Sequence, residues 1–348
     1  MSASQRKKRP RSKPEATGSS GTVVIGTYDG GLLGFGLEDG AQTFGYAPHV
    51  GCIKTVHCNQ EGKLASGATD NAVRLFDLSK RIELGELQEH QDSVSALQFW
   101  NGTLVTASSD GQVCIWRGGD FELLLKFQGH KAAVTSLAVH PSGRMIASTG
   151  RDLRIQLWDL TRGTSAAHLS LKENAEVLEW SPCGDRIAVL CPRELMAVQV
   201  KTNHTASFKD PSSAGFVRIN FTAVSWLSSS MLALGDAKGE VRILTFDGEA
   251  LTQACALPPK EADAPATRVK ALATCAQRLL VGLSSGEVEV WSTPADLGEQ
   301  AAPEAADFRK LRVVQTKGRL TCMTVWAPEE ETSKSPSAPG KKQKSQKT

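Results

Sequence analysis

The chain has 348 residues, with 40 Lys and Arg against 37 Asp and Glu, a formal net charge of +3 and 40% hydrophobic residues. This hydrophobic content suffices for a packed core and excludes disorder along the whole chain. No stretch holds the roughly 18 consecutive apolar residues that a membrane-spanning helix needs, so we expect no membrane insertion.

The N-terminal segment is strongly basic. Residues 1–20 have a net charge of +5 and lack the apolar core of a secretory signal, so we expect a disordered intracellular tail. Its basic cluster reads RKKRPRSK and contains Arg6, Lys7, Lys8, Arg9, Arg11 and Lys13. Such a cluster is typical of nuclear import or of a nucleic-acid contact, and the remaining alternative is a solubilising end.

A repeat follows the tail. An aspartate recurs at intervals of 41, 40 and 42 residues, and an aromatic residue stands six positions after each copy. The pairs are Asp29 and Phe35, Asp70 and Phe76, Asp110 and Trp116, and Asp152 and Trp158. A short apolar segment precedes each aspartate, at 22–27, 63–68, 103–108 and 145–150, and similar segments continue at 186–191, 231–236 and 279–284. Their near-continuous apolarity predicts strands buried on both faces.

The dipeptides Gly129-His130 and Trp158-Asp159 complete the repeat, with Glu89-His90 and Phe76-Asp77 as weaker versions. Four strands per 40 to 45 residues, with Gly-His and Trp-Asp dipeptides, are typical of a WD40 β-propeller. The sequence therefore predicts an all-β protein with disordered basic tails.

The number of blades follows from the repeat. Residues 21–47 supply three strands of a blade that lacks its first, and 319–328 supply a first strand that nothing strand-like follows. We expect these two fragments to share one blade, which would leave no open sheet edge. Six further blades are expected at 49–89, 90–129, 130–171, 172–215, 216–265 and 266–318. The prediction is a monomeric seven-bladed ring over 21–328, followed by a disordered Lys-rich tail at 329–348.

Two blades carry the full polar set of the repeat, which is His90, Asp110 and Trp116 in one and His130, Asp152 and Trp158 in the other. We expect a buried network in which the histidine bonds the turn aspartate and reaches both a strand hydroxyl, Thr106 or Ser148, and the tryptophan. Asp70 and Phe76 form a partial copy. A general-base pair is the alternative, but recurrence once per blade favours a structural role.

The blades expected at 172–215 and 216–265 have lost this set, and Leu244 stands where a tryptophan would. We expect them to be less rigidly specified. Partner-binding candidates precede the turn aspartates of the better copies, at Thr69, Ser109 and Arg151.

Catalytic motifs are absent from the sequence. The Gly-rich stretch GGLLGFG lacks the following helix that a phosphate loop needs, and the eight cysteines form no CxxC pair. We therefore expect no enzyme activity, no cofactor and no metal site.

The stretch over 90–190 resembles one WD40 subfamily. The residues that carry the resemblance read SVSALQFWNGTLVTASSDGQVCIW, then HKAAVTSLAVHPSGRMIASTGRDLRIQLWDLTRG, then ENAEVLEWSPCGDRIAV. They are similar to the PAK-interacting proteins and their fungal maintenance-of-killer counterpart. The C-terminal tail is shorter than in the longer members, which puts a function of an extended tail in doubt.

This resemblance implies a non-catalytic scaffold of the nucleus and nucleolus, with a role in large ribosomal subunit assembly and rRNA processing. Its implied partners are ribosomal proteins or pre-ribosomal assembly factors, and the basic tails would add non-specific rRNA contacts. The alternative is a signalling adaptor that negatively regulates a p21-activated-type kinase. A ubiquitin-ligase receptor would need helical extensions, which the sequence does not indicate.

Overall fold

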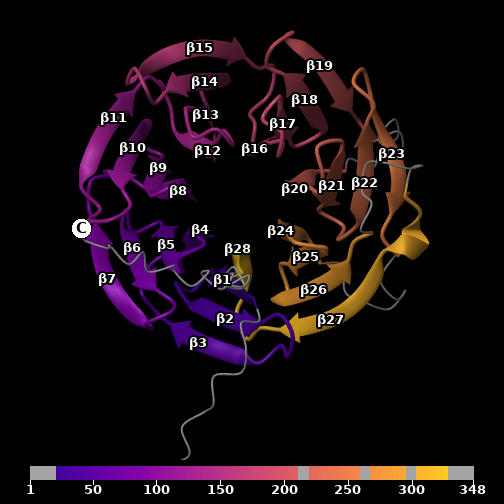
Figure 1. The fold of residues 1–348 in the computed structure, drawn as a ribbon, viewed down its shortest axis with the longest axis horizontal. Coiled ribbons are helices and arrows are strands. Elements are labelled where there is room, and N and C mark those ends of the chain that lie inside the picture. The colour runs from indigo at the N-terminus through magenta and orange to yellow at the C-terminus, as the bar shows by residue number, and fades with distance from the viewer. Residues whose placement is uncertain (1–20, 211–218, 259–266, 295–302, 328–348) are drawn as a thin grey trace, which may run out of the picture.

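The computed structural model describes residues 21–210, 219–258, 267–294 and 303–327, which form a ring of seven four-stranded antiparallel sheets (Figure 1). The ring confirms the predicted all-β fold class, a seven-bladed β-propeller. Both predicted basic tails lie outside the described residues. No helix among the described residues is long and apolar enough to cross a membrane.

Each blade has four strands, ordered here from the central channel outward. Blade 1 comprises β28 (Leu320–Trp326), β1 (Thr22–Thr27), β2 (Leu32–Gly36) and β3 (Gln42–Tyr46). Blade 2 comprises β4 (Ile53–Cys58), β5 (Lys63–Ala68), β6 (Val73–Asp77) and β7 (Ile82–Leu87). Blade 3 comprises β8 (Val94–Trp100), β9 (Thr103–Ser108), β10 (Gln112–Arg117) and β11 (Leu123–Gln128). Blade 4 comprises β12 (Val134–Val139), β13 (Met145–Gly150), β14 (Arg154–Asp159) and β15 (Thr164–Ser170).

The other three blades follow the same order. Blade 5 comprises β16 (Val177–Trp180), β17 (Arg186–Cys191), β18 (Glu194–Gln199) and β19 (His204–Phe208). Blade 6 comprises β20 (Phe221–Trp226), β21 (Met231–Asp236), β22 (Val241–Phe246) and β23 (Leu251–Ala256). Blade 7 comprises β24 (Val269–Cys275), β25 (Arg278–Leu283), β26 (Glu287–Ser292) and β27 (Arg309–Gln315), with the short 3-10 helix η2 (Ala305–Asp307) before β27.

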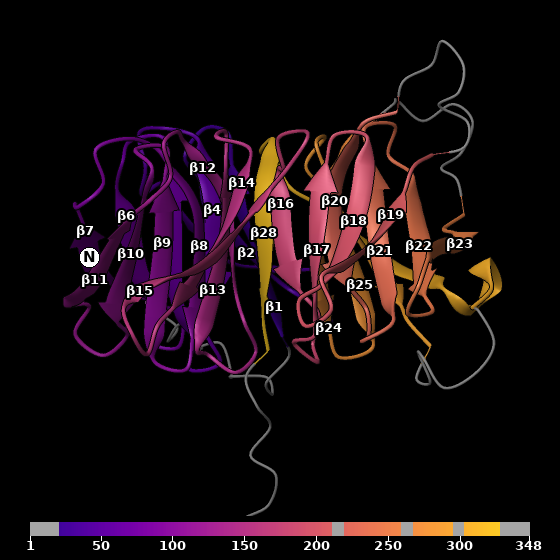
Figure 2. The same cartoon turned by 90° about the horizontal axis from the view of Figure 1, so that it is seen from above.

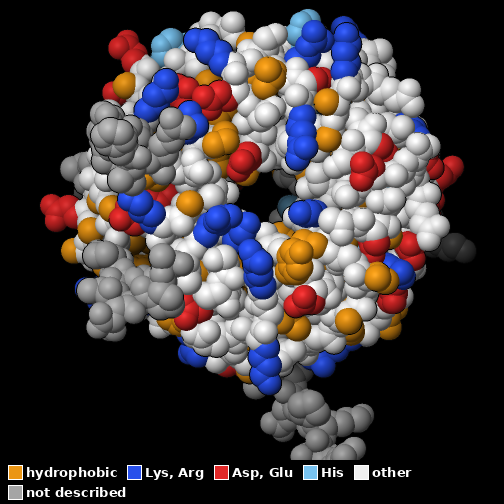
Figure 3. Space-filling view, turned by 180° about the vertical axis from the view of Figure 1, so that it is seen from behind, with side chains coloured by type: hydrophobic (Ala, Val, Ile, Leu, Met, Phe, Trp, Pro, Cys, Tyr) orange, Lys and Arg blue, Asp and Glu red, His pale blue; other side chains and the backbone are white. Residues whose placement is uncertain are grey.

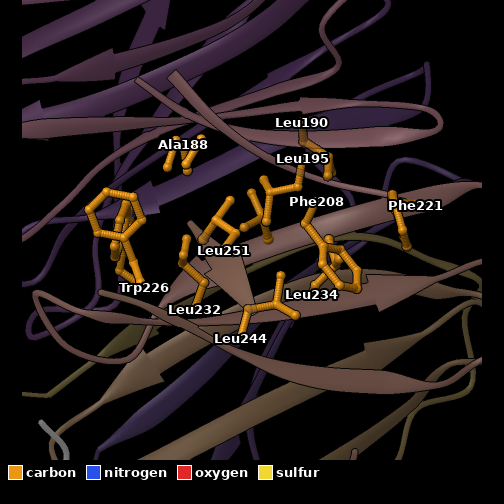
Figure 4. Packing of buried hydrophobic residues seen from close by; sticks show 14 of the residues in the cluster. Ala188, Leu190, Leu195, Phe208, Phe221, Trp226, Leu232, Leu234, Leu244 and Leu251 are labelled. Atoms are coloured by element: carbon orange, nitrogen blue, oxygen red, sulfur yellow. The ribbon is translucent and has the colours of Figure 1, made fainter. Parts of the chain in front are cut away.

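The core consists of the interfaces between neighbouring blades. The second strand of a blade packs on both of its faces, so every residue of β1 and of β21 is buried. The outermost strands have one side in solvent, and β15 is exposed along most of its length. Figure 4 shows one interface, where Leu190 and Leu195 of blade 5 meet Leu232 and Leu234 of blade 6. Each blade is therefore stabilised mainly by its two neighbours.

Polar side chains on the innermost strands add a second link between blades, because they accept hydrogen bonds from backbone N–H groups of the next blade. The bonds run from Leu97 to Thr55 (3.2 Å), from Phe99 to His57 (3.3 Å), from Val139 to Gln98 (2.9 Å), and from Leu178 to Ser136 (3.0 Å). They fix the rotation of one blade against the next.

Blade 1 closes the ring from two distant parts of the chain. β28 pairs with β1 in antiparallel register, with Thr22 opposite Trp326 and Gly26 opposite Cys322. The two described ends, Gly21 and Ala327, therefore lie side by side on one face of the ring (Figure 2).

The face of the ring that carries Gly21 and Ala327 is called the opposite face below, because it lies opposite the face that carries the connections between blades. The opposite face also carries the turns between first and second strands and between third and fourth strands. The other face carries the connections from blade to blade and the turns between second and third strands, and we call it the connection face. Figure 3 views the connection face.

Candidate interaction site

Blade 3 contains a buried polar network at the connection face. His90 Nδ1 lies 3.3 Å from Asp110 Oδ2, and His90 Nε2 lies 2.8 Å from Thr106 Oγ1. The indole N–H of Trp116 donates to the same Thr106 hydroxyl at 2.9 Å. Burial lowers the pKa of His90 against the opposing influence of Asp110. The imidazole thus bridges the connection before the blade, the turn within it and its second strand.

Blade 4 repeats this arrangement. His130 Nδ1 lies 3.1 Å from Asp152 Oδ1, and its Nε2 lies 2.8 Å from Ser148 Oγ, to which Trp158 Nε1 also donates at 2.8 Å. Burial alone would raise the pKa of Asp152, but hydrogen bonds from the Lys131 N–H and from His130 hold it below its usual value. The tryptophan reaches the shared hydroxyl rather than the histidine.

Blade 2 has a third network, whose histidine the sequence analysis missed. His49 Nδ1 lies 3.0 Å from Asp70 Oδ2, and its Nε2 lies 2.8 Å from Ser66 Oγ. His49 precedes Asp70 by 21 residues, close to the 22 that separate the corresponding pair of blade 4. That spacing was the available signal, but His49 follows proline instead of glycine. Phe76 occupies the tryptophan position and has no N–H to donate.

These networks position the backbone of the connection face. The hydroxyls of Ser66, Thr106 and Ser148 are fully buried, at 0% exposure, so no substrate can reach them. Each histidine instead fixes a connection between blades to a turn, which determines how the intervening loops are presented to solvent.

Substituting the shared hydroxyl of blade 4 should destabilise the fold more than the same substitution in blade 2. Ser148→Ala removes a hydrogen-bond partner from both His130 Nε2 and the buried indole N–H of Trp158, whereas Ser66→Ala removes one from His49 Nε2 alone. Each buried polar group left without a hydrogen-bond partner lowers the free energy of unfolding by about 1–3 kcal/mol. Urea denaturation should therefore show a loss of unfolding free energy for Ser148→Ala roughly twice that for Ser66→Ala. Equal losses would show that the tryptophan bond contributes nothing.

Blade 6 replaces the histidine pair with a buried ion cluster. Asp210 follows β19 by two residues, as His130 follows β11, and it pairs with the Arg242 guanidinium. Arg242 also lies 3.6 Å from Asp236 and 3.2 Å from Glu240. Burial raises the pKa of Asp236 despite hydrogen bonds from neighbouring N–H groups. A different polar cluster thus connects the same parts of the blade, and Leu244 packs at 0% exposure where other blades have a tryptophan.

Blade 5 uses a carboxyl group of its innermost strand. Glu179 Oε1 accepts hydrogen bonds from the Trp226 N–H and the Ser225 hydroxyl of blade 6, both at 3.3 Å. Burial raises the pKa of Glu179 to about 7. Sequence reasoning did not identify this residue, because no repeat position marks it.

A channel of about 510 Å³ runs through the ring and is lined by the innermost strands. His57 lines its wall, and burial lowers the pKa of this histidine to about 4. Among the described residues, no group of three or more His, Cys, Asp or Glu is placed to hold a metal ion. Cys58, Cys114 and Cys191 are buried in strands, and Cys183 is exposed.

The three partner-binding candidates share the connection face, each in the turn between the second and third strand of its blade. Thr69 and Arg151 are exposed, and Ser109 is half-buried. The Thr69 hydroxyl accepts a hydrogen bond from the Cys52 N–H at 3.0 Å, so it also fixes the connection into blade 2. The nuclear-targeting candidates at residues 6–13 lie outside the described residues.

Comparisons with known proteins agree with this architecture. A family model described as "WD domain, G-beta repeat" matches residues 82–117 and 121–159. The chain is 30% identical over 327 residues to the p21-activated protein kinase-interacting protein 1-like of Danio rerio, covering 90% of this chain and 83% of that protein. It is 31% identical over 201 residues to protein MAK11 of Saccharomyces cerevisiae, 48% of each chain.

Among solved structures, the crystal structure of the RRP9 WD40 repeats superposes with a TM-score of 0.65 at 13% identity, covering 78% of this chain and 82% of that one. At this identity the likeness concerns the fold alone.

Proposed function

Because the chain belongs to the WD40-repeat family of p21-activated protein kinase-interacting proteins and MAK11, we propose that it is a non-catalytic scaffold for assembly of the large ribosomal subunit. In this role it holds ribosomal proteins or assembly factors on pre-ribosomes, in the nucleus and nucleolus. Family membership carries the proposal, since the resemblance over residues 90–190 implies this role.

Two features of the chain support the proposal. A propeller presents loops on a rigid frame, which suits simultaneous contacts with several proteins. The basic segments 1–20 and 329–348 continue from described ends that lie side by side on the opposite face. As disordered tails flanking a monomeric ring over 21–328, they would supply nuclear targeting and salt-dependent attraction to rRNA from one position.

Depleting the protein from its source cells should lower the ratio of large to small ribosomal subunits. Longer, unprocessed rRNA precursors should accumulate at the same time. Sucrose-gradient profiles and RNA blots measure both effects. Re-expression of the wild-type chain should restore the profile, whereas a chain with residues 6–13 neutralised to Gln should restore it poorly and accumulate outside the nucleolus. Normal subunit ratios after full depletion would refute the assembly role.

A second candidate function is negative regulation of a p21-activated-type kinase. The name of the Danio rerio relative, a p21-activated protein kinase-interacting protein 1-like, favours it. If this function is correct, the purified full chain should bind the regulatory region of the kinase. A tagged copy of the protein should also be cytoplasmic on imaging, both with and without residues 1–20.

A further inference from the structure

The connection face carries a set of Lys and Arg side chains without carboxylate partners. They are Lys54, Lys131, Arg151, Lys172, Arg193, Lys238, Arg268, Lys270, Lys317 and Arg319, all exposed except the half-buried Lys270. Among the described residues, none of them forms an ion pair within 4.0 Å. Figure 3 shows Lys and Arg side chains gathered beside the central opening of this face.

The opposite face differs, because its cations are largely neutralised by neighbouring carboxylates. The pairs are Lys63 with Glu61, Lys80 with Asp77, Arg117 with Asp120 and Glu122, Arg162 with Asp159, Lys201 with Asp185, and Arg278 with Glu38. Among the described residues, the connection face therefore presents more Lys and Arg side chains without an ion-pair partner than the opposite face, where Arg81 and Arg144 are such residues.

Four of the unpaired cations converge at the mouth of the channel. Lys54 and Lys270 are the second residues of the innermost strands β4 and β24. Arg319 and Arg268 directly precede the innermost strands β28 and β24. Burial lowers the pKa of Lys270, and the nearby charges of Arg268, Arg319 and Lys54 lower it further against the opposing influence of Glu176. These groups repel one another in the free protein, so a bound polyanion would relieve the repulsion.

An exposed aromatic ring lies beside this cluster. Tyr28, in the turn between β1 and β2, is 56% exposed, and the Arg319 guanidinium lies 5.5 Å from its ring centroid. An aromatic surface flanked by cations is the arrangement with which proteins bind single-stranded nucleic acids, since bases stack on the ring and phosphates contact the cations.

We propose that the connection face binds single-stranded RNA, with phosphates at Lys54, Arg268, Lys270 and Arg319 and an unpaired base stacked on Tyr28. The cations extend over several blades instead of lining one groove, which suits a nucleic-acid backbone better than an acidic peptide. The choice of RNA among polyanions rests on the proposed role in ribosome assembly, whereas the charge of the face does not depend on that role.

The test measures binding of a fluorescein-labelled single-stranded RNA to the purified full chain by anisotropy, over a series of KCl concentrations. Replacing three cations at the channel mouth (Lys54→Gln, Lys270→Gln, Arg319→Gln) should weaken binding about tenfold or more near 0.1 M salt. It should also reduce the slope of log K against log salt by about 2, since each phosphate contact on a single strand contributes about 0.7.

The matched control removes the same charge from the opposite face (Arg81→Gln, Arg144→Gln, Arg162→Gln) and should change affinity less than about twofold. A variant with Arg6, Lys7 and Lys8 changed to Gln separates the contribution of the N-terminal segment. Tyr28→Ala should weaken binding about fivefold or more, and Tyr28→Phe should preserve it, because stacking needs only the ring.

Equal affinity and slope for the channel-mouth variant and its control would overturn the proposal. Binding of a labelled poly-glutamate peptide tests the alternative that the face binds an acidic protein. If the channel-mouth variant no longer binds this peptide but still binds RNA with unchanged affinity, the face is a protein-docking surface and the proposal is wrong. The outcome is separable from the proposed function, because normal ribosome profiles after depletion would refute the assembly role without changing RNA affinity in vitro.

Discussion

A chain that ends at Gly318 should fail to fold into a stable ring. It lacks β28, the innermost strand of blade 1, so β1 loses one of its two antiparallel partners and presents an open edge. It also loses Leu320, which is 0% exposed and packs in the core cluster between blades 7 and 1. Losing a whole strand from two interfaces is comparable to the net stability of a domain, about 5–15 kcal/mol.

The matched control is a chain that ends at Ala327, which keeps β28 and lacks only the residues that follow it. We expect this control to be soluble and to melt at nearly the full-length temperature by circular dichroism, whereas the chain ending at Gly318 aggregates. Leu320→Ala in the full chain is a milder version and should cost about 2–5 kcal/mol. A soluble, cooperatively melting Gly318 chain would show that β28 is dispensable.

Arg242→Met should be the most destabilising single substitution of a polar side chain described here. Arg242 is 8% exposed and pairs with Asp210 and Asp236, which are themselves buried. Removing one partner of a buried ion cluster leaves uncompensated charge and costs about 3–5 kcal/mol. Arg117→Met is the control, since Arg117 also contacts two carboxylates but is half exposed, and we expect it to cost less than about 1 kcal/mol.

The Arg242→Met variant should regain part of its stability as the pH falls. The pKa of Asp236 is already raised by burial, and loss of the guanidinium should raise it further. A carboxyl group whose pKa is higher in the folded state binds its proton more tightly there, so acidification through that pKa stabilises the fold. Urea denaturation at several pH values measures this; a deficit that does not shrink on acidification contradicts the assigned role of Asp236.

The repeat made the fold predictable, because the Asp-to-aromatic interval recurs in four blades and the apolar second strand in all seven. The networks of His90 and His130 followed from the same pattern. His49 escaped because Pro48 replaces the expected glycine, although its hydrogen bonds match those of the other two histidines.

The polar groups of blades 5 and 6 could not be predicted in the same way. In blade 6 an acidic residue, Asp210, stands where the other networks have a histidine, and its partner is the basic residue Arg242. Only the fold shows that these two residues meet. Glu179 is one acidic residue among many in the sequence, and its raised pKa depends on the packing of blade 6 against blade 5. The basic channel mouth combines residues of blades 1, 2 and 7, which the ring brings together.

The pairing of β28 with β1 sets the order of events during translation. β1, with the apolar sequence TVVIGT, leaves the ribosome before every other strand described here, and its partner β28 leaves last. At the usual rate of about 5–20 residues per second, the edge of β1 that faces β28 in the folded ring stays without its partner for a time on the order of tens of seconds, although β2 pairs with the other edge. Ring closure therefore waits until β28 has left the ribosome, and until then one edge of β1 stays open.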